Sequence, residues 1–187
     1  LFDSAKKLSI NNTYDKDFIC EAISRTLEAN DLKDARIRLT LSSGPMSQGN
    51  VKSTLLITAT AFQPYPAEYY EKGVLAVLSD YRQNPFEPTT GHKTLNYFSR
   101  IAALGEAHRK GAAEAIWFTT DKRLAEGCVS NVFLVKDSVL YTPTLATPVL
   151  AGVARKTVCQ ICSENSIRLV EKDLFIEDLL SDDEIFF

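Results

Sequence analysis

EGCVSNVFLVKD, residues 126–137, is the stretch that decides the fold of this chain. A carboxylate and a glycine precede a polar turn, and the apolar run NVFLV that follows predicts a strand. Upstream, HKTLNYF at residues 92–98 leads from a loop into a helical apolar pattern, and downstream LAGVARKTV at residues 150–158 opens another helix. Each segment alone says little, but their order and spacing together are informative.

Length and composition bound the class of protein. The chain has 187 residues, 45% hydrophobic and 24% charged, which is enough to bury a core in one domain or in two small ones. Its net charge of −3 is spread over segments of mixed sign without a run of Lys or Arg, which argues against nucleic acid or an anionic membrane as partner. Apolar runs fall short of the roughly 18 to 20 residues that span a bilayer, and the first residues lack a signal-peptide layout. We therefore expect a cytoplasmic globular protein.

The first part of the chain predicts an N-terminal α/β subdomain over residues 1–82. Helical patterns at residues 1–10 and 15–30 precede a strand with period-two alternation at residues 35–44. The tract SSGPMSQGN at residues 42–50 reads as a turn or loop, residues 51–62 as a second strand and PYPAEYYEKG as a proline-broken connection. VLAVLSDYR then supplies the third strand that we expect in this subdomain.

A linker is expected at residues 83–92, within QNPFEPTTGHK, because two prolines and a glycine occur there without an apolar period. Residues 93–187 then form a second subdomain. TLNYFSRIAALGEAHRKG predicts a helix that ends at Gly111 with a left-handed cap. The later segments predict, in order, three short strands, a helix, an extended run and a short acidic helix: AEAIWFTT, SNVFLVKD, SVLYTP, VARKTVCQICSEN, IRLVEKDL and FIEDLLSDDE.

Four cysteines are too few and too irregularly placed for a disulfide framework. The pair in CQIC, Cys159 and Cys162, raises the alternatives of zinc or redox chemistry, but no second Cys/His pair lies nearby. Three-residue spacing puts both thiols on one helix face, where free Cys packs as a small apolar residue. We expect core packing and no metal site. The sequence also lacks a nucleophile elbow, a phosphate loop and a dinucleotide fingerprint.

Taken together, HKTLNYF, EGCVSNVFLVKD and LAGVARKTV resemble the class IV aminotransferases, the fold-type IV family of pyridoxal 5′-phosphate (PLP) enzymes. The resemblance covers nearly the whole chain. It implies an α/β (α+β) fold of the D-amino-acid-aminotransferase-like type, with two subdomains and PLP in the cleft between them. It also implies a homodimer that acts on amino-acid and 2-oxo-acid substrates.

Within HKTLNY, Lys93 matches the position at which this family forms its Schiff base with PLP. A Schiff base forms only from a neutral amine, which requires surroundings that lower the pKa of the lysine. The alternative is an ordinary solvated cation at a helix start. Tyr97 follows four residues later and is expected to share a helix face with Lys93. The resemblance assigns its hydroxyl to the phenolic oxygen of PLP, whereas the alternative is an amphipathic core tyrosine.

Glu126 is the second anchor of the resemblance. Holding carbanion charge in the PLP ring needs a protonated ring nitrogen, and a neighbouring carboxylate favours that charged form. The family uses a glutamate for this task, and Gly127 would allow a tight turn beside the ring. A glutamate on a surface hairpin is the alternative. Ser130 and Asn131 are expected to shape the loop.

The phosphate end of the resemblance lies at residues 150–155. Gly152 precedes a helix, and the exposed N–H groups of a helix start form an anion site. The family presents the next two amides to the phosphate, here Val153 and Ala154, while Leu150 would pack on the ring. Ala154 stands where the family usually has Thr, so a hydroxyl contact is lost. For Arg155, a structural role and a phosphate contact both stay open.

The resemblance leaves three functions open. The first is amino-group transfer through Lys93, with branched-chain, D-amino-acid and amine substrates all open. The second is an aminodeoxychorismate lyase, which releases pyruvate and 4-aminobenzoate. The third is a degenerate homologue without catalysis, because the family pattern begins before Leu1 with a phosphate-binding Arg and continues past Phe187. We expect a chain trimmed at both ends.

Overall fold

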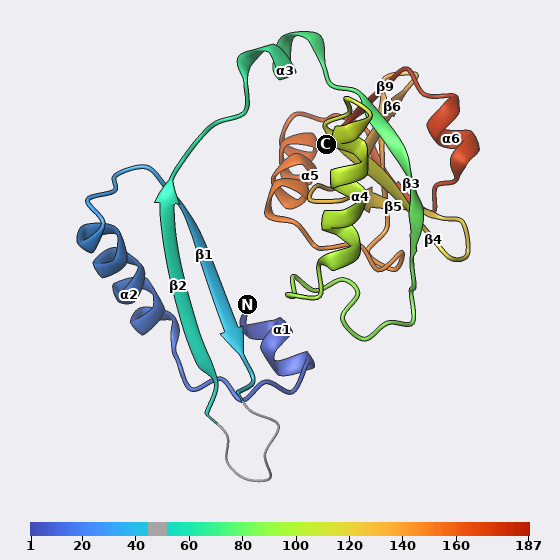
Figure 1. Ribbon diagram of the computed structural model, residues 1–187. Coiled ribbons are helices and arrows are strands. Elements are labelled where there is room, and N and C mark those ends of the chain that lie inside the picture. Colours follow the sequence, from blue (N-terminus) through green and yellow to red (C-terminus); the bar gives the residue numbers. More distant parts are fainter. Residues whose placement is uncertain (45–51) are drawn as a thin grey trace. The chain divides into compact units, whose positions relative to one another are not determined.

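The computed structural model describes residues 1–44 and 52–187, and it contains helices and strands throughout, as expected for the α/β (α+β) class (Figure 1). The chain divides into two compact units, Leu1–Glu71 and Lys72–Phe187. Each unit has its own sheet structure and is described separately.

The first unit is a pair of long strands with helices before it. Helices α1 (Phe2–Lys7) and α2 (Lys16–Ala29) precede β1 (Ala35–Ser42) and β2 (Thr54–Ala61), which pair antiparallel. The carboxylate of Asp15 starts α2 by accepting the Phe18 N–H at 2.8 Å, the usual N-cap contact. Of the expected loop at residues 42–50, residues 45–50 lie outside the described residues.

The third strand expected in the first subdomain belongs to the second unit. Strand β3 (Ala76–Gln83) pairs parallel with β4 (Glu114–Thr119), so its hydrogen-bond partner comes from later in the chain. The boundary between the two compact units accordingly follows Glu71, ahead of the expected linker at residues 83–92. Alternation predicts that a segment is a strand, but it carries no information about the partner strand. The proline-broken connection also holds a short helix, α3 (Ala67–Lys72).

The second unit contains two sheets. The first has the order β3-β4-β5, in which β5 (Leu124–Gly127) pairs antiparallel with β4. The second has the order β8-β7-β6-β9, built from β6 (Phe133–Lys136), β7 (Val139–Pro143), β8 (Leu169–Lys172) and β9 (Glu184–Phe186). Helices α4 (Phe98–Arg109), α5 (Val153–Glu164) and α6 (Ile176–Leu180) complete the unit. Neither β5 nor β9 was expected from the sequence.

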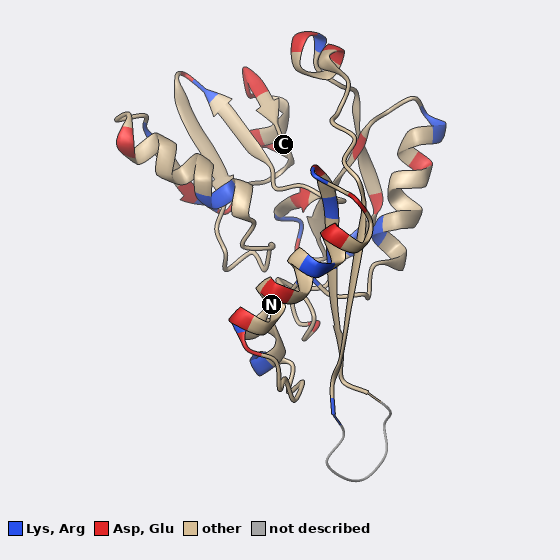
Figure 2. Cartoon of the chain, turned by 90° about the vertical axis from the view of Figure 1, so that its left-hand side faces the viewer, with Lys and Arg blue, Asp and Glu red and all other residues tan. Residues whose placement is uncertain are grey.

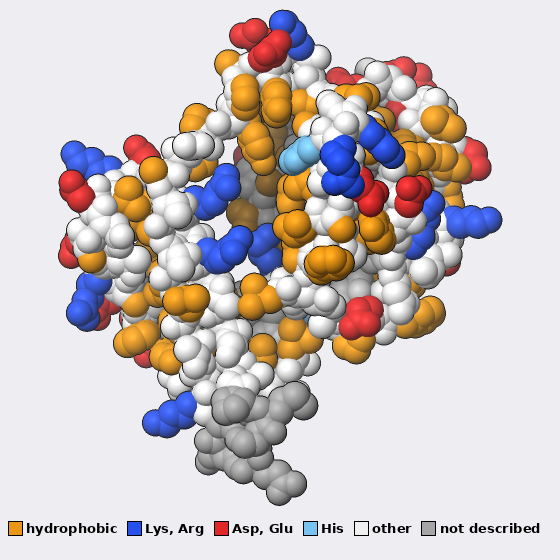
Figure 3. All heavy atoms as spheres, viewed as in Figure 1, with side chains coloured by type: hydrophobic (Ala, Val, Ile, Leu, Met, Phe, Trp, Pro, Cys, Tyr) orange, Lys and Arg blue, Asp and Glu red, His pale blue; other side chains and the backbone are white. Residues whose placement is uncertain are grey.

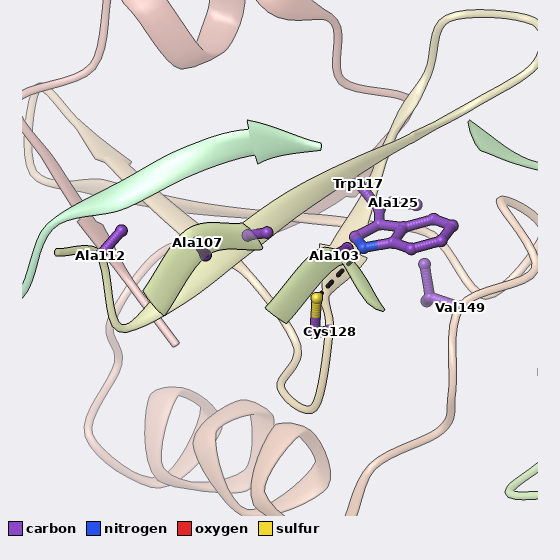
Figure 4. Packing of buried hydrophobic residues seen from close by; sticks show 8 residues of the cluster. Ala103, Ala107, Ala112, Trp117, Ala125, Cys128 and Val149 are labelled. Carbon is purple, nitrogen blue, oxygen red and sulfur yellow. Dashed lines mark hydrogen bonds between the residues drawn. The ribbon is translucent and has the colours of Figure 1, made fainter. Parts of the chain in front are cut away.

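Strand β4 is the centre of this unit, because all six of its residues are buried. Successive side chains of a strand point to opposite faces. Ala115 and Trp117 pack with the small residues Ala103 and Ala107 of α4 (Figure 4), whereas Ile116 and Phe118 pack with Leu124, Val132, Leu134, Leu174 and Leu179. The small side chains of Ala103 and Ala107 let α4 pack close to the sheet.

The start of α4 is a correction to the sequence prediction. The helix begins at Phe98, after a tight turn in which the Tyr97 N–H donates to the Leu95 carbonyl at 2.8 Å. The Thr94 hydroxyl also accepts the Asn96 N–H at 3.3 Å, a local contact that competes with helix formation. Lys93 therefore lies in the preceding loop, and the expectation that it shares a helix face with Tyr97 is wrong. The predicted left-handed cap at Gly111 is confirmed by its φ of 75°.

The CQIC pair lies on α5, where Cys162 is buried in a cluster with Phe133 and Leu140. Among the described residues, all four cysteines are free, and no group of three or more His, Cys, Asp or Glu is placed to hold a metal. The expected core packing is confirmed for Cys162, whereas Cys159 is only half-buried and lies outside this cluster.

Acidic and basic residues are interspersed over the chain (Figure 2), and on the face in Figure 3 both signs lie among hydrophobic side chains. None of the helices in the described ranges combines the length and apolar character needed to cross a bilayer.

Candidate active site

A cavity of about 240 Å³ lies in the second unit, where the chain leaves β3 and turns into α4. Parallel strands commonly place binding crevices beyond their carboxyl ends, and Gln83 at the end of β3 lines this one. Four residues singled out from the sequence also line it: Lys93, Tyr97, Glu126 and Leu150. Their positions come from a loop, the residue before α4, strand β5 and the loop before α5.

Glu126 is held by both of its carboxylate oxygens. Its Oε1 accepts from the Arg100 guanidinium at 2.8 Å, and its Oε2 accepts the Leu150 N–H at 2.9 Å. Each side chain of the Arg100–Glu126 pair is only 12% exposed. Burial raises the pKa of the Glu126 carboxyl above its ordinary value, while Arg100, the Leu150 N–H and Lys93 act to lower it. This is a buried carboxylate with a fixed orientation, so the alternative of a surface hairpin glutamate does not apply.

Leu150 reaches the cavity through a turn that Asn131 fixes. The Asn131 amide donates from Nδ2 to the Leu150 carbonyl at 2.8 Å, and the Gly152 N–H donates to the same carbonyl at 2.8 Å. Asn131 thus shapes the loop, as the sequence suggested. Ser130 holds its own loop, the one after β5, since its hydroxyl donates to Glu114 at 2.7 Å.

Tyr97 lines the cavity with its hydroxyl turned toward the β5–β6 loop. The hydroxyl donates to the Cys128 carbonyl at 3.0 Å. Burial raises the pKa of the Tyr97 phenol, and the charge of Glu126 acts in the same direction while Arg100 opposes it. The phenol therefore stays protonated and able to donate a hydrogen bond.

Of the segment expected to bind the cofactor phosphate and ring, residues 150–155, only Leu150 lines this cavity. Gly152 is the N-cap of α5 with extended backbone, and in the part of the chain that the structure describes no side chain caps this helix start. Gly152, Val153 and Ala154 are not among the residues that line the cavity, and Val153 is 86% exposed. Arg155 is buried and turned away: its guanidinium donates to the Pro143 carbonyl at 2.9 Å and pairs with Glu171. The structure thus gives Arg155 a structural role.

Three polar residues of the site escaped the sequence reading: Gln83, Arg100 and Glu114. Arg100 is the ion-pair partner of Glu126, and Gln83 accepts a hydrogen bond from Arg100. Glu114 is 6% exposed and accepts the Cys128 N–H at 2.8 Å, which ties down the loop after β5. Two signals were available: a charged residue that begins the mostly apolar strand EAIWFT, and another within the apolar pattern of α4.

Comparison with known proteins identifies the family of this chain. The family model for amino-transferase class IV matches residues 1–187. This chain belongs to the class IV aminotransferases. The family suggested by the three sequence segments is therefore confirmed, and PLP is the cofactor of this family.

Relatives within the family carry two activities. The branched-chain-amino-acid aminotransferase of Pseudomonas aeruginosa is 30% identical over the whole of this chain and 63% of its own length. The aminodeoxychorismate lyase of Bacillus subtilis is 33% identical over 96% of this chain and 62% of its own length. The solved branched-chain aminotransferase of Escherichia coli superposes with a TM-score of 0.90 at 30% identity, over 99% of this chain and 64% of that one. The chain thus spans just under two thirds of the length of these relatives.

Proposed function

We propose that this chain carries the catalytic centre of a PLP-dependent aminotransferase, which moves an amino group between an amino acid and a 2-oxo acid. One observation carries the proposal: Lys93, Tyr97 and Glu126, distant in sequence, line one cavity together with Leu150. The donor set fits PLP, because it joins an amine, a phenol that stays protonated and an oriented carboxylate.

The proposed roles follow from the chemistry of each side chain. Lys93 would hold the cofactor through its amine and then carry a proton between the substrate Cα and the cofactor. Glu126 would face the ring nitrogen. Tyr97 would donate to the phenolic oxygen, for which its single hydroxyl donor has to turn away from the Cys128 carbonyl that it contacts here. Leu150 would pack on the ring, and the cofactor itself supplies an aldehyde and an electron-withdrawing ring.

For the cofactor phosphate we propose the amides of Val153 and Ala154 after Gly152. The support is physical: the first N–H groups of a helix lack intrahelical partners, and the helix dipole favours an anion there. Ala154 can contribute its amide alone, since it has no hydroxyl.

Two further parts of the proposal rest on residues outside the cavity. A cytoplasmic location fits the four free thiols found among the described residues. A homodimer fits the apolar outer side of α4, where Phe98 and Ile101 are 85% and 60% exposed, and Figure 3 shows hydrophobic side chains over this part of the surface. Light scattering across a dilution series tests the dimer.

The test of function separates transfer from elimination. Incubated with single amino acids and no 2-oxo acid, the PLP-loaded protein should produce pyridoxamine 5′-phosphate with at least one of them. Pyruvate or 2-oxoglutarate should then restore PLP. The lyase of Bacillus subtilis keeps elimination as the second candidate. Pyruvate released from aminodeoxychorismate, with no pyridoxamine 5′-phosphate from any amino acid, would select it, and failure to bind PLP would select a non-catalytic homologue.

A further inference from the structure

The environment of Arg100 is more elaborate than a simple ion pair requires. Besides Glu126, its guanidinium donates to the side-chain oxygen of Gln83 and to the Gly127 carbonyl, the residue that ends β5. Its carbon centre also lies 4.3 Å from the centre of the Trp117 ring, a cation–π geometry. Four groups from β3, β4 and β5 therefore fix one side chain of α4.

Gln83 and Trp117 are in turn anchored. The Gln83 amide donates to the Pro148 carbonyl at 2.5 Å, and Trp117 donates from Nε1 to the Cys128 sulfur at 3.3 Å (Figure 4). The Tyr81 ring stacks on Trp117 with centroids 5.9 Å apart. Arg100 thus has little freedom to turn, and its planar fork can bind several oxygens at once, which a lysine ammonium cannot reproduce.

From this geometry we propose that Arg100 is a positioning residue that fixes the Glu126 carboxylate at the wall of the cavity, with Gln83 and Trp117 orienting Arg100. The inference rests on the proposed function, in which Glu126 faces the ring nitrogen of PLP. Arg100 acts on the cofactor through Glu126, and its guanidinium is already committed to protein oxygens.

The charges around Glu126 support this role. Burial favours the neutral carboxyl and raises its pKa, and Arg100 is the strongest influence in the opposite direction, ahead of the Leu150 N–H and Lys93. Tyr97 also faces this group, as a neutral phenol. Without Arg100, the carboxyl would keep its burial and lose its main counter-charge, so it would bind a proton more tightly. A neutral Glu126 supports a protonated ring nitrogen less well.

The primary test is the titration of Glu126 in three proteins: the parent, Arg100→Gln and Arg100→Lys. Infrared difference spectra follow the protonation of the Glu126 carboxyl before any cofactor is added. The carboxyl band is assigned to Glu126 by its absence in Glu126→Gln. The titration midpoint should move to higher pH in Arg100→Gln and return part of the way in Arg100→Lys, which keeps the charge without the fork. An unchanged midpoint in Arg100→Gln would overturn the proposal. If Arg100→Gln does not fold, Arg100→Met, which also removes the charge, takes its place under the same criterion.

A cofactor titration then asks whether Arg100 acts through Glu126. Arg100→Gln should bind PLP about tenfold or more weakly, because a charge-assisted contact to the ring nitrogen is lost. Adding Arg100→Gln to Glu126→Gln should weaken binding little further, whereas losses that multiply would contradict an action through Glu126.

Arg123→Gln is the matched control. Arg123 is 17% exposed and pairs with Asp121 at 2.9 Å, and it is not among the residues that line the cavity. This control should leave both the Glu126 midpoint and PLP affinity unchanged. If PLP fails to bind even to the parent, the proposed function fails, while the infrared titration still judges the role of Arg100.

Discussion

The amide oxygen of Asn131 fills the space beside Gly152 that any Cβ there would need. The same amide donates to the Leu150 carbonyl at 2.8 Å, and the Leu150 N–H donates to Glu126 at 2.9 Å. One side chain therefore fixes both the turn that brings Leu150 to the cavity and the start of α5. Gly152 is needed here for the close approach, since its φ of −64° is open to any residue.

Gly152→Ala should destabilise the protein by about 1 to 3 kcal/mol, because Asn131 or the turn must move to admit the methyl group. PLP binding should weaken as well, since the displaced turn carries Leu150 and the first amides of α5. Denaturant unfolding and a cofactor titration measure the two effects.

Gly105→Ala is the matched control for that substitution. Gly105 lies within α4, and its added Cβ would meet only Arg109 Nη1 at 3.8 Å, an ordinary contact. This variant should be as stable as the parent or up to about 1 kcal/mol more stable, because Gly in a helix interior carries an entropic cost. Equal losses in the two variants would contradict the assigned role of Asn131.

Glu114→Gln should loosen the loop after β5. The two carboxylate oxygens of Glu114 accept the N–H groups of Ala115 and Cys128 at 2.9 and 2.8 Å and the Ser130 hydroxyl at 2.7 Å. A glutamine can keep its oxygen on the two N–H groups and donate its amide to the Ser130 hydroxyl, which can also accept, so the cost is the lost charge assistance of these bonds, about 1 kcal/mol. Denaturant unfolding measures the loss. The exposed Glu164→Gln should change stability by less than about 0.5 kcal/mol, and a comparable loss there would show that the buried contacts are not responsible.

The outcome for individual residues shows what local sequence contains. Lys93, Tyr97, Glu126 and Leu150 could be singled out because each stands in a short segment with a typical neighbourhood, and the structure places all four on one cavity. Arg100 could not be paired with Glu126, because that contact depends on how α4 lies across β4 and β5. The start of α4 was placed too early for a related reason. The apolar period continues through Leu95, but the Thr94 hydroxyl and the Leu95–Tyr97 turn take the backbone contacts that a helix would need.

The unfolding free energy should respond to pH through Glu126. Burial raises its pKa above the ordinary value of 4.5, with Arg100 opposing, so the folded state binds this proton more tightly than the unfolded state. The resulting stability is fully present below the unfolded pKa and is lost as pH rises through the folded pKa. Stability of the parent should therefore fall relative to Glu126→Gln over a window that starts near pH 4.5 and extends upward. Unfolding both proteins across that range measures the difference, and a constant difference would contradict the raised pKa.

Arg155→Lys should cost stability without altering phosphate recognition. The buried guanidinium is committed to the Pro143 carbonyl and Glu171, and a lysine cannot reproduce its fork. We expect a loss of about 1 to 3 kcal/mol in the free energy of unfolding. The preference for PLP over pyridoxal, which lacks the phosphate, should stay as in the parent. A roughly tenfold drop in that preference, worth about 1.4 kcal/mol, would instead make Arg155 a phosphate ligand.

Lys93 should be the residue that reacts with the cofactor. It lines the cavity, and its charge acts on the pKa of Glu126, which places the amine in the electrostatic environment of the carboxylate. Borohydride reduction of the PLP-loaded protein should therefore fix the cofactor on the peptide that contains Lys93, because reduction turns the amine–aldehyde link into a stable bond. Lys93→Met should abolish the label, and Lys110→Met, at an exposed position just after α4, should leave it unchanged. A label on another lysine, or one that persists in Lys93→Met, would remove Lys93 from the proposed reaction and leave the cavity without its nucleophile.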